Sequence, residues 1–210
     1  MAKNKPSKVE EAKLKSNYLR GTIAEVLGDQ SIESFDHDDI QAMKFHGIYQ
    51  QDDRDKREGK HKEYSFMIRT KMPGGRMTAE QYLAMDDIAQ RFTHPVSLRI
   101  TTRQAFQFHG VIKGELKSTM KQLNDPLVRP IAACGDVERN VMCTPAPIQD
   151  ALHDSLRSIT DEIATKLAPA TGAYYEIWLD GEKVVRNETD AAAGSEEPFY
   201  GEAYLPRKFK

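Results

Sequence analysis

Alternation between hydrophobic and polar positions is clearest within residues 63–133. Over residues 64–72, successive side chains would point to opposite faces of an extended chain, which predicts a strand that ends at the following Pro-Gly-Gly. The spacing becomes helical after Thr78 and Gln81, a pair typical of a capping box. The hydrophobic positions of this predicted helix are Met85, Ile88, Ala89 and Phe92.

Three more strands and a second helix complete this region. The alternation predicts strands at residues 96–101 and 105–112, and the next hydrophobic spacing predicts a helix over residues 116–123. Residues 127–133 predict a last strand, which its prolines place near a sheet edge. The order β-α-β-β-α-β is that of the ferredoxin-like unit, so the predicted fold class is α+β.

The flanking regions carry weaker patterns. Residues 1–62 predict an extended N-terminal arm, followed at residues 51–62 by a dense charge run that is typical of a solvated loop. Residues 134–210 predict the start of a second α+β domain, with a helical stripe from Leu152 to Leu167 and a hairpin whose tight turn is Asp180-Gly181. Basic residues end the sequence without a closing element, so we expect the polypeptide to be incomplete.

Composition and charge exclude several classes of protein. The 210 residues suffice for one large or two small domains, and the net charge of -2 means that any anion site must be local. No apolar run reaches membrane-spanning length and no signal peptide is present, so we predict a cytoplasmic protein without a membrane partner. Cys134 and Cys143 lack metal-site spacing, and no residue is assigned as a metal ligand.

A polar strand face without acidic neighbours is the most informative feature for function. No Asp or Glu occurs from Arg91 to Lys113. Such a donor-rich face needs an external anion, and the guanidinium fork suits carboxylates and oxyanions. An ordinary solvated strand face is the alternative interpretation. The polar positions are Arg99, Thr101, Arg103, Gln107 and His109, and the positions expected in the core are Val96, Leu98, Ile100, Phe106 and Phe108.

Three further groups of cations are candidates for chemistry. Arg69 lies on the polar side of its strand, Arg139 precedes Asn140, and Lys208 and Lys210 are two residues apart, so a strand would point both ammonium groups the same way. Each group alone is also compatible with ordinary surface charge. The sequence contains no Ser/His/Asp arrangement, no P-loop and no dinucleotide-binding glycine motif.

Six stretches of the sequence form a recognisable series: Asn17-Tyr-Leu-Arg-Gly-Thr-Ile23, Lys44-Phe-His-Gly-Ile-Tyr-Gln-Gln-Asp-Asp-Arg54, Ile68-Arg69 to Pro73-Gly-Gly75, Leu98-Arg-Ile-Thr-Thr-Arg-Gln-Ala-Phe-Gln-Phe-His-Gly110, Arg139-Asn-Val-Met-Cys-Thr144 and Leu205-Pro-Arg-Lys-Phe-Lys210. Taken in order, they closely resemble the hemoprotein (beta) subunit of assimilatory sulfite reductase, within the siroheme nitrite/sulfite reductase family. The resemblance covers nearly all of residues 17–210, and it implies that residues 50–54 belong to an N-terminal segment that wraps around the core.

The resemblance implies siroheme, an iron tetrahydroporphyrin with eight carboxylates, coupled to a 4Fe–4S cluster, and the six-electron reduction of sulfite to sulfide. By position in the matched motifs, four residues correspond to cations around the substrate: Arg69, Arg139, Lys208 and Lys210. Seven residues correspond to siroheme-contacting positions: Arg99, Thr101, Thr102, Arg103, Gln107, His109 and Arg207.

The resemblance also implies an electron donor, either an NADPH flavoprotein subunit or ferredoxin, and a role in sulfate assimilation and cysteine biosynthesis. The family's cluster cysteines lie farther downstream, so the chain alone is expected to be inactive. Two alternatives stay open. Related members reduce nitrite, and ferredoxin-like sheets also bind RNA through aromatics on an open face, although Phe106 and Phe108 share parity with core positions and no nucleic-acid partner is predicted.

Overall fold

The computed structural model describes residues 8–16, 19–53, 57, 59, 62–136 and 138–169, together with the backbone of residues 177–179 and 182–184. Within this part of the chain the predicted α+β class is confirmed. None of the helices described is long and apolar enough to cross a membrane.

A four-stranded antiparallel sheet in the order β1-β2-β4-β3 forms the centre of the fold. The inner strands are β2 (Tyr64–Arg69) and β4 (Phe106–Val111), and the edge strands are β1 (Ile48–Asp52) and β3 (Leu98–Ile100). The predicted strands at residues 64–72, 96–101 and 105–112 therefore form, in shorter versions. The Pro-Gly-Gly segment turns the chain as the 3-10 helix η1 (Pro73–Gly75).

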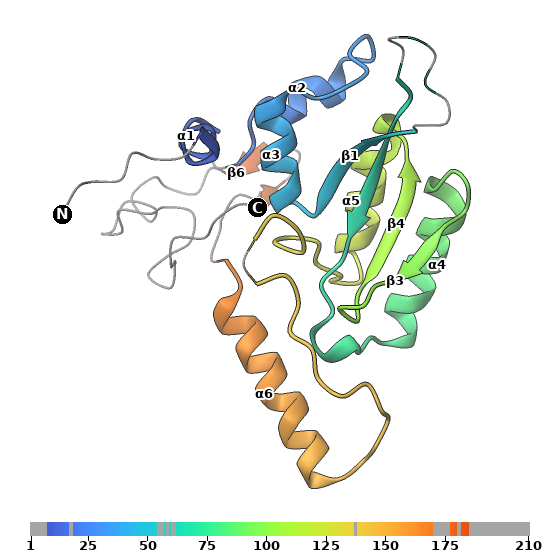
Figure 1. Ribbon diagram of the computed structural model, residues 1–210, viewed down its shortest axis with the longest axis vertical. Coiled ribbons are helices and arrows are strands. Elements are labelled where there is room, and N and C mark those ends of the chain that lie inside the picture. Colours follow the sequence, from blue (N-terminus) through green and yellow to red (C-terminus); the bar gives the residue numbers. More distant parts are fainter. Residues whose placement is uncertain are drawn as a thin grey trace, which may run out of the picture.

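Two helices, α4 (Ala79–Phe92) and α5 (Leu116–Asn124), cover one face of this sheet, and the short η2 (Lys113–Glu115) precedes α5 (Figure 1). The core between the layers contains fully buried residues of both, among them Phe66, Phe108 and Ile88. The predicted capping box starts α4, because Thr78 accepts from the Gln81 amide and the Gln81 side chain accepts from the Thr78 amide.

The predicted last strand at residues 127–133 does not form. Only Lys71 and Arg129 pair there, as an isolated bridge in which Lys71 N donates to Arg129 O at 2.8 Å. Pro126 directly precedes this segment and Pro130 lies within it, and a proline has no N–H to donate to a ladder. The sheet edge beside β2 is occupied instead by β1, which comes from the N-terminal region.

The described part of the N-terminal region, residues 8–16 and 19–53, contains three helices and β1. Asp36 caps its third helix by accepting from Asp39 N at 2.8 Å. Buried Asp39 in turn accepts from the Thr22 amide and hydroxyl, which connects the start of α3 to the segment before α2. The helices before β1 are α1 (Lys8–Lys15), α2 (Ile23–Gly28) and α3 (His37–Phe45).

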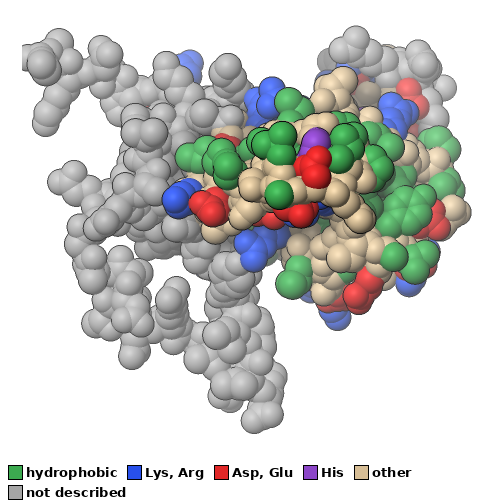
Figure 2. All heavy atoms as spheres, turned by 90° about the horizontal axis from the view of Figure 1, so that it is seen from below, with side chains coloured by type: hydrophobic (Ala, Val, Ile, Leu, Met, Phe, Trp, Pro, Cys, Tyr) green, Lys and Arg blue, Asp and Glu red, His purple; other side chains and the backbone are tan. Residues whose placement is uncertain are grey.

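The predicted second helix stripe belongs to α6 (Ala151–Leu167), which extends away from the sheet (Figure 1). Its large hydrophobic residues are exposed, with Leu152 at 66% and Ile159 at 52%. Figure 2 views this end of the molecule and shows hydrophobic side chains at several places on its surface. The helix contacts η1 and buries Thr160 and Ala164.

The predicted hairpin beyond α6 consists of β5 (Ile177–Leu179) and β6 (Glu182–Val184), which pair antiparallel. The start of a second domain, and the boundaries 1–62, 63–133 and 134–210, stay predictions.

Two residues expected in the core lie at the surface. Val96 is 56% exposed and Ile100 is 77% exposed, whereas Leu98 between them packs against the core. Because β3 is a three-residue edge strand, its ends extend beyond the part of the sheet that the helices cover. The alternation predicted the correct face of the strand but not how far the core reaches along it.

Candidate functional site: a cationic face of the sheet

Three predicted site residues form a row across the sheet. Arg69 of β2 is opposite Gln107 of β4, and Gln107 is opposite Arg99 of β3. Opposite residues of antiparallel strands point to the same face, and alternation places this row on the face away from buried Phe106 and Phe108. The row therefore lies on the side of the sheet that α4 and α5 do not cover.

Hydrogen bonds through Gln107 connect this row. With its amide oriented to satisfy its neighbours, Gln107 Oε1 accepts from Arg69 Nε at 2.8 Å and from Arg69 Nη2, and its Nε2 donates to His109 Nε2 at 3.2 Å. Burial lowers the pKa of His109, and the nearby charges of Arg99 and Arg69 lower it further. His109 is thus a neutral imidazole at pH 7, with the ring proton on Nδ1 in this arrangement.

Arg139 shares its surroundings with Arg69. Burial raises the pKa of Tyr49 on β1 and the neighbouring Cys134 raises it further, whereas Arg139 and Arg69 lower it. Burial also raises the pKa of Cys134 to about 11, against the opposing effect of the same two guanidinium groups. Arg69 and Arg139, both predicted to surround the substrate, therefore act on the same two groups, half-buried Tyr49 and buried Cys134. The Arg139 side chain is held by donation from Nε to Asp136 O at 3.2 Å.

Residues 138–143, which we call the arginine strap, run beside the end of β2 and η1. A buried ion pair joins Lys71 to Glu138, whose side chains are 9% and 10% exposed. Gly74 N donates to Val141 O at 2.9 Å. Gly74 has φ of 63°, and a Cβ there would lie 3.1 Å from Cys143 Sγ, so the close approach of the strap favours glycine.

Two side-chain amides fix the strap to its neighbours. Asn140 Oδ1 accepts from Met72 N at 2.9 Å, and its Nδ2 donates to Met72 O at 2.9 Å and to Arg103 O at 2.6 Å. In the opposite direction, Gln104 Nε2 donates to Cys143 O at 2.7 Å and Gln104 Oε1 accepts from Cys143 N at 3.3 Å. The strap, the end of β2 and the turn between β3 and β4 thus form one hydrogen-bonded unit.

The turn between β3 and β4 holds the other predicted residues of this region. Thr101 Oγ1 accepts from the amides of Arg103 and Ala105, both at 3.2 Å, which closes the turn. Thr102 and Arg103 are exposed in it. The prediction that Arg103 shares a strand face with Arg99 is therefore wrong, because the chain reverses direction before residue 103.

The charge on this face is not balanced within the described part of the chain. Arg69, Arg99, Arg103 and Arg139 form no ion pair there. Acidic residues occur near the start of β2, where a hollow of about 550 Å³ is lined by Arg99, His109, Asp52 and Asp53 among others, and Asp52 there pairs with Arg57. The face is thus cationic near Arg69 and mixed near the start of β2.

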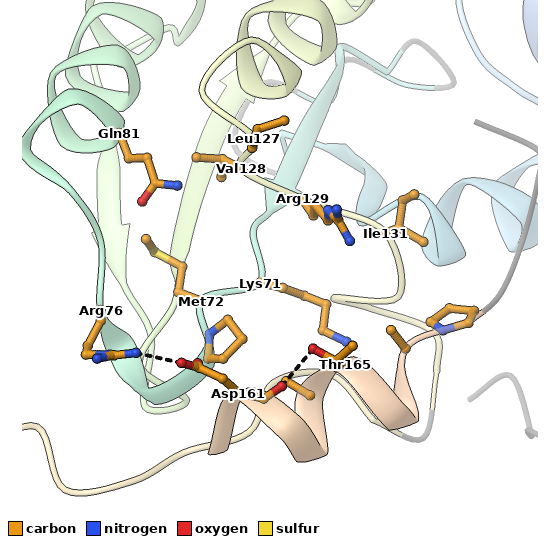
Figure 3. Close-up of a pocket in the computed structure, with 14 residues that line it drawn as sticks. Lys71, Met72, Arg76, Gln81, Leu127, Val128, Arg129, Ile131, Asp161 and Thr165 are labelled. Atoms are coloured by element: carbon orange, nitrogen blue, oxygen red, sulfur yellow. Dashed lines mark hydrogen bonds and ion pairs between the residues drawn. The ribbon is translucent and has the colours of Figure 1, made fainter. Parts of the chain in front are cut away.

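A second hollow, of about 430 Å³, lies between α6 and residues 127–131 (Figure 3). Arg76 and Asp161 form an exposed ion pair of 2.7 Å across one end of it. Its described lining includes Lys71 and Arg129 but none of the predicted site residues.

Of the predicted site residues, the structure brings Arg69, Arg99, Gln107 and His109 together on one face, with Arg139 near Arg69. Three others, Arg207, Lys208 and Lys210, lie outside the described residues. The site prediction did not include Tyr49, Cys134 or Asn140. Tyr49 and Cys134 are far apart in sequence from the arginines they approach, and only Asn140 gave a signal, as a polar residue beside Arg139.

Among the described residues, no group of three or more His, Cys, Asp or Glu side chains could hold a metal ion. The geometry of the face instead presents guanidinium, imidazole, amide and hydroxyl groups. These are donors for an anionic ligand larger than a single ion.

Comparison with known proteins identifies relatives over the whole chain. Residues 57–126 match the family described as the nitrite/sulfite reductase ferredoxin-like half domain. The chain is 49% identical over 212 residues to the NADPH sulfite reductase hemoprotein beta-component of Staphylococcus saprophyticus, covering 99% of this chain and 36% of that protein. It is 50% identical over 210 residues to the protein of the same name from Anoxybacillus flavithermus, covering 98% of this chain and 36% of the relative.

The chain therefore spans about a third of the length of these relatives, with 36% covered in both cases. Among solved structures, that of the Mycobacterium tuberculosis NirA protein superposes with a TM-score of 0.65 at 23% identity, over 80% of this chain and 33% of that one. This likeness supports the fold of the described unit.

Proposed function

We propose that this chain, a homologue of the sulfite reductase hemoprotein beta-component over about a third of that protein's length, contributes the cationic face on which a siroheme-dependent sulfite reductase holds its cofactor and its substrate. The reaction is the six-electron reduction of sulfite to sulfide, as part of sulfate assimilation. The observation that carries the proposal is the row Arg69–Gln107–Arg99, with Arg139 beside it and no ion pair to any of these arginines within the described residues.

The donor set on this face fits siroheme. A macrocycle with eight carboxylates needs several guanidinium and neutral hydrogen-bond donors, and Arg99, Gln107 and His109 supply these from adjacent strands. Arg103, Thr101 and Thr102 add donors from the turn. Siroheme, when bound, supplies the redox chemistry, and the role of these residues is to bind and orient it.

Arg69 and Arg139 are proposed to hold sulfite. Both guanidinium groups act on the same two neighbours, so their charges add at one place. Sulfite is a small dianion at neutral pH, and paired Nη–H donors stabilise the negative charge on its oxygens while water is released. Tyr49 keeps its Oη proton through this pH range because burial raises its pKa. We extend the substrate assignment to Lys208 and Lys210, and the siroheme assignment to Arg207, on the resemblance alone.

We place the ligands of the 4Fe–4S cluster outside the described residues, and we propose an NADPH flavoprotein subunit as the electron donor, as the name of the relatives suggests.

The RNA-binding alternative has little support from this sheet. Phe106 is 8% exposed and Phe108 is fully buried, so the strands do not present these aromatics as a stacking platform. Nitrite remains the competing substrate, because the matched family includes nitrite reductases.

The test is a hybrid hemoprotein in which this chain replaces the matching third of the Staphylococcus saprophyticus relative. We expect the hybrid to bind siroheme, seen as its Soret absorption, and to turn sulfite into sulfide with a higher specificity constant than for nitrite. The unaltered relative and a hybrid carrying Arg69→Ala with Arg139→Ala serve as controls. A hybrid that folds but binds no siroheme would refute the proposal, and a preference for nitrite would replace the substrate.

A further inference from the structure

We infer that Asn140 is a positioning residue that sets the direction of Arg139 relative to Arg69 and Arg103. This inference rests on the proposed function and deepens it, because it names a residue behind the cations that does not itself contact an anion. Asn140 is 9% exposed, and its side chain is directed into the protein.

One buried amide connects three segments, each of which carries a proposed ligand-binding arginine. Asn140 follows Arg139 directly in the chain. Its side chain pairs with both backbone groups of Met72, which is three residues after Arg69, and with the carbonyl of Arg103 itself. A displacement of this amide would therefore move Arg139 relative to the other two arginines.

The backbone of Met72 explains why an amide is needed. Met72 follows the end of β2 and is 3% exposed, so its N–H and C=O lie away from water. An asparagine side chain offers both an acceptor and two donors, and here all three form bonds of 2.6–2.9 Å. Aspartate has the same shape but no N–H, and it would place a carboxylate against the carbonyls of Met72 and Arg103.

The reciprocal contact from Gln104 makes this positioning specific. Gln104 holds the backbone of Cys143 while Asn140 holds the backbone of Arg103, so two amides bind the strap to the turn from opposite sides. The Asn140 contact fixes the strap directly after Arg139, and the Gln104 contact fixes it at Cys143. Loss of Asn140 leaves the strap attached to the turn through Gln104 alone, so the strap loosens and Arg139 is freed to reorient.

The experiment compares Asn140→Asp and Asn140→Ala with the control Asn124→Ala, which alters an exposed asparagine at the end of α5. The readouts in the sulfite reductase holoenzyme that contains this chain are siroheme content, sulfite kcat/KM and sulfite KM. We expect both Asn140 variants to retain siroheme and to lose kcat/KM by on the order of 100-fold, as for a misplaced catalytic group. Asn124→Ala should match the wild type in all three.

A second readout does not depend on activity. In the full 210-residue chain, the rate of Cys143 alkylation by a maleimide reports loosening of the strap, and we expect it to rise by on the order of 10-fold in Asn140→Asp. The buried thiol of Cys134 serves as the internal reference, and its rate should not change.

Three results would overturn the inference. The first is normal sulfite kcat/KM in both Asn140 variants while Arg139→Ser is impaired, which would leave the proposed function intact. The second is loss of siroheme in parallel with activity, which would make Asn140 a structural residue only. The third is normal turnover by Arg139→Ser itself, which would refute the substrate role of Arg139 and the positioning role of Asn140 together.

Discussion

At the scale of single residues, the cations of this region differ in whether their charge is available to a ligand. Lys71 shares the face of β2 with Arg69, yet its ammonium group is neutralised by Glu138 in a buried ion pair. Arg69 instead donates to the neutral amide of Gln107, which leaves its positive charge uncompensated. Because a buried pair separates only at a high cost, Lys71 is expected to be structural and Arg69 to be free for an anion.

The proposed division of roles among the arginines gives the first prediction. In the hybrid hemoprotein, Arg139→Ser should lower sulfite kcat/KM by on the order of 100-fold and leave siroheme content near normal, because it removes a charge that faces the substrate. Arg99→Ala should instead lower siroheme content more than turnover per bound siroheme. Steady-state kinetics and absorption spectra measure both quantities.

The control for this comparison is Arg91→Ala. Arg91 lies on α4 and pairs with Asp87 at 3.0 Å, on the layer that covers the other face of the sheet. It should change neither quantity. Equal losses of siroheme in Arg139→Ser and Arg99→Ala would contradict the division between substrate and cofactor residues.

His46 gives a prediction on stability and pH. Burial lowers the pKa of His46 to about 4, although its bond of 2.6 Å to Leu19 O opposes this shift. A histidine with a depressed pKa in the folded state contributes stability above its unfolded pKa near 6.5, and this contribution is lost as pH falls through 4. From pH 6.5 to 4 the free energy of unfolding should therefore fall by at most about 3 kcal/mol from this group alone.

Urea unfolding at several pH values measures this contribution as a difference between variants. His46→Gln, which retains a donor for Leu19 O, should show a shallower loss of stability between pH 6.5 and 4 than the wild type. His37→Gln alters an exposed imidazole and should follow the wild-type curve. Parallel curves for His46→Gln and the wild type would mean that His46 titrates normally.

At the scale of elements, α6 is attached by its small residues and not by its hydrophobic stripe. Ala164 and Thr160 are buried against the rest of the protein, whereas Ile159 is 52% exposed. Ala164→Leu should therefore overpack the contact and cost about 1–3 kcal/mol, while Ile159→Lys should stay within about 0.5 kcal/mol.

The protection of the α6 backbone amides from hydrogen exchange measures the strength of this contact at the helix itself. Protection should fall by on the order of 10-fold or more in Ala164→Leu, which follows from the free-energy range above. Ile159→Lys serves as the comparison on the opposite side of the same helix. A larger loss of protection in Ile159→Lys than in Ala164→Leu would show that the stripe, and not Ala164, anchors the helix.

The elements that the sequence predicted correctly are those whose signals are local. The Thr78–Gln81 pair and the helical spacing after it suffice to place α4, and alternation suffices for β2 and β4. The edge strand was wrong because its identity depends on a long-range competition. Residues 48–52 and 127–133 both reach the same edge of β2, and local alternation cannot rank two candidates for one edge.

The residues of the candidate site show the same contrast between local signals and long-range contacts. Alternation predicted that Arg99 and Gln107 share a strand face and placed Arg69 on the polar side of a separate strand, and the register of the sheet brings the three together. The role of Asn140 could not be assigned from the sequence. It depends on hydrogen bonds to the backbone of residues 72 and 103, which only the fold brings next to Asn140. Such side-chain to backbone contacts leave no pattern in the sequence of either partner.

At the scale of the whole molecule, the net charge is small, but the positive and negative side chains are not evenly mixed. The chain carries 30 basic and 32 acidic residues for a net charge of -2, yet the arginines of the sheet face have no ion-pair partner within the described residues. Uniform mixing of these charges would have given most arginines an acidic neighbour. The proposed function uses this separation as a local site for a polyanion in a nearly neutral protein.

This separation predicts that the 210-residue chain binds uroporphyrin, a porphyrin with eight carboxylates, even without an iron–sulfur cluster. We expect saturable binding that weakens with salt, because the contacts are between guanidinium and carboxylate groups. Coproporphyrin, with four carboxylates on the same ring, should bind more weakly. At a ligand concentration 100 times the Kd, binding should stabilise the chain by about 2.7 kcal/mol in thermal or urea unfolding.

A charge-matched pair of variants distinguishes the sheet face from the overall charge. Arg69→Gln with Arg99→Gln removes two cations from the proposed site, and Arg91→Gln with Lys117→Gln removes two from the helices on the other layer. Fluorescence titration should show a Kd raised by on the order of 10-fold or more in the first variant and little changed in the second. Equal weakening in both would mean that uroporphyrin senses only net charge, and the sheet face would then have no special affinity for a polycarboxylate ring.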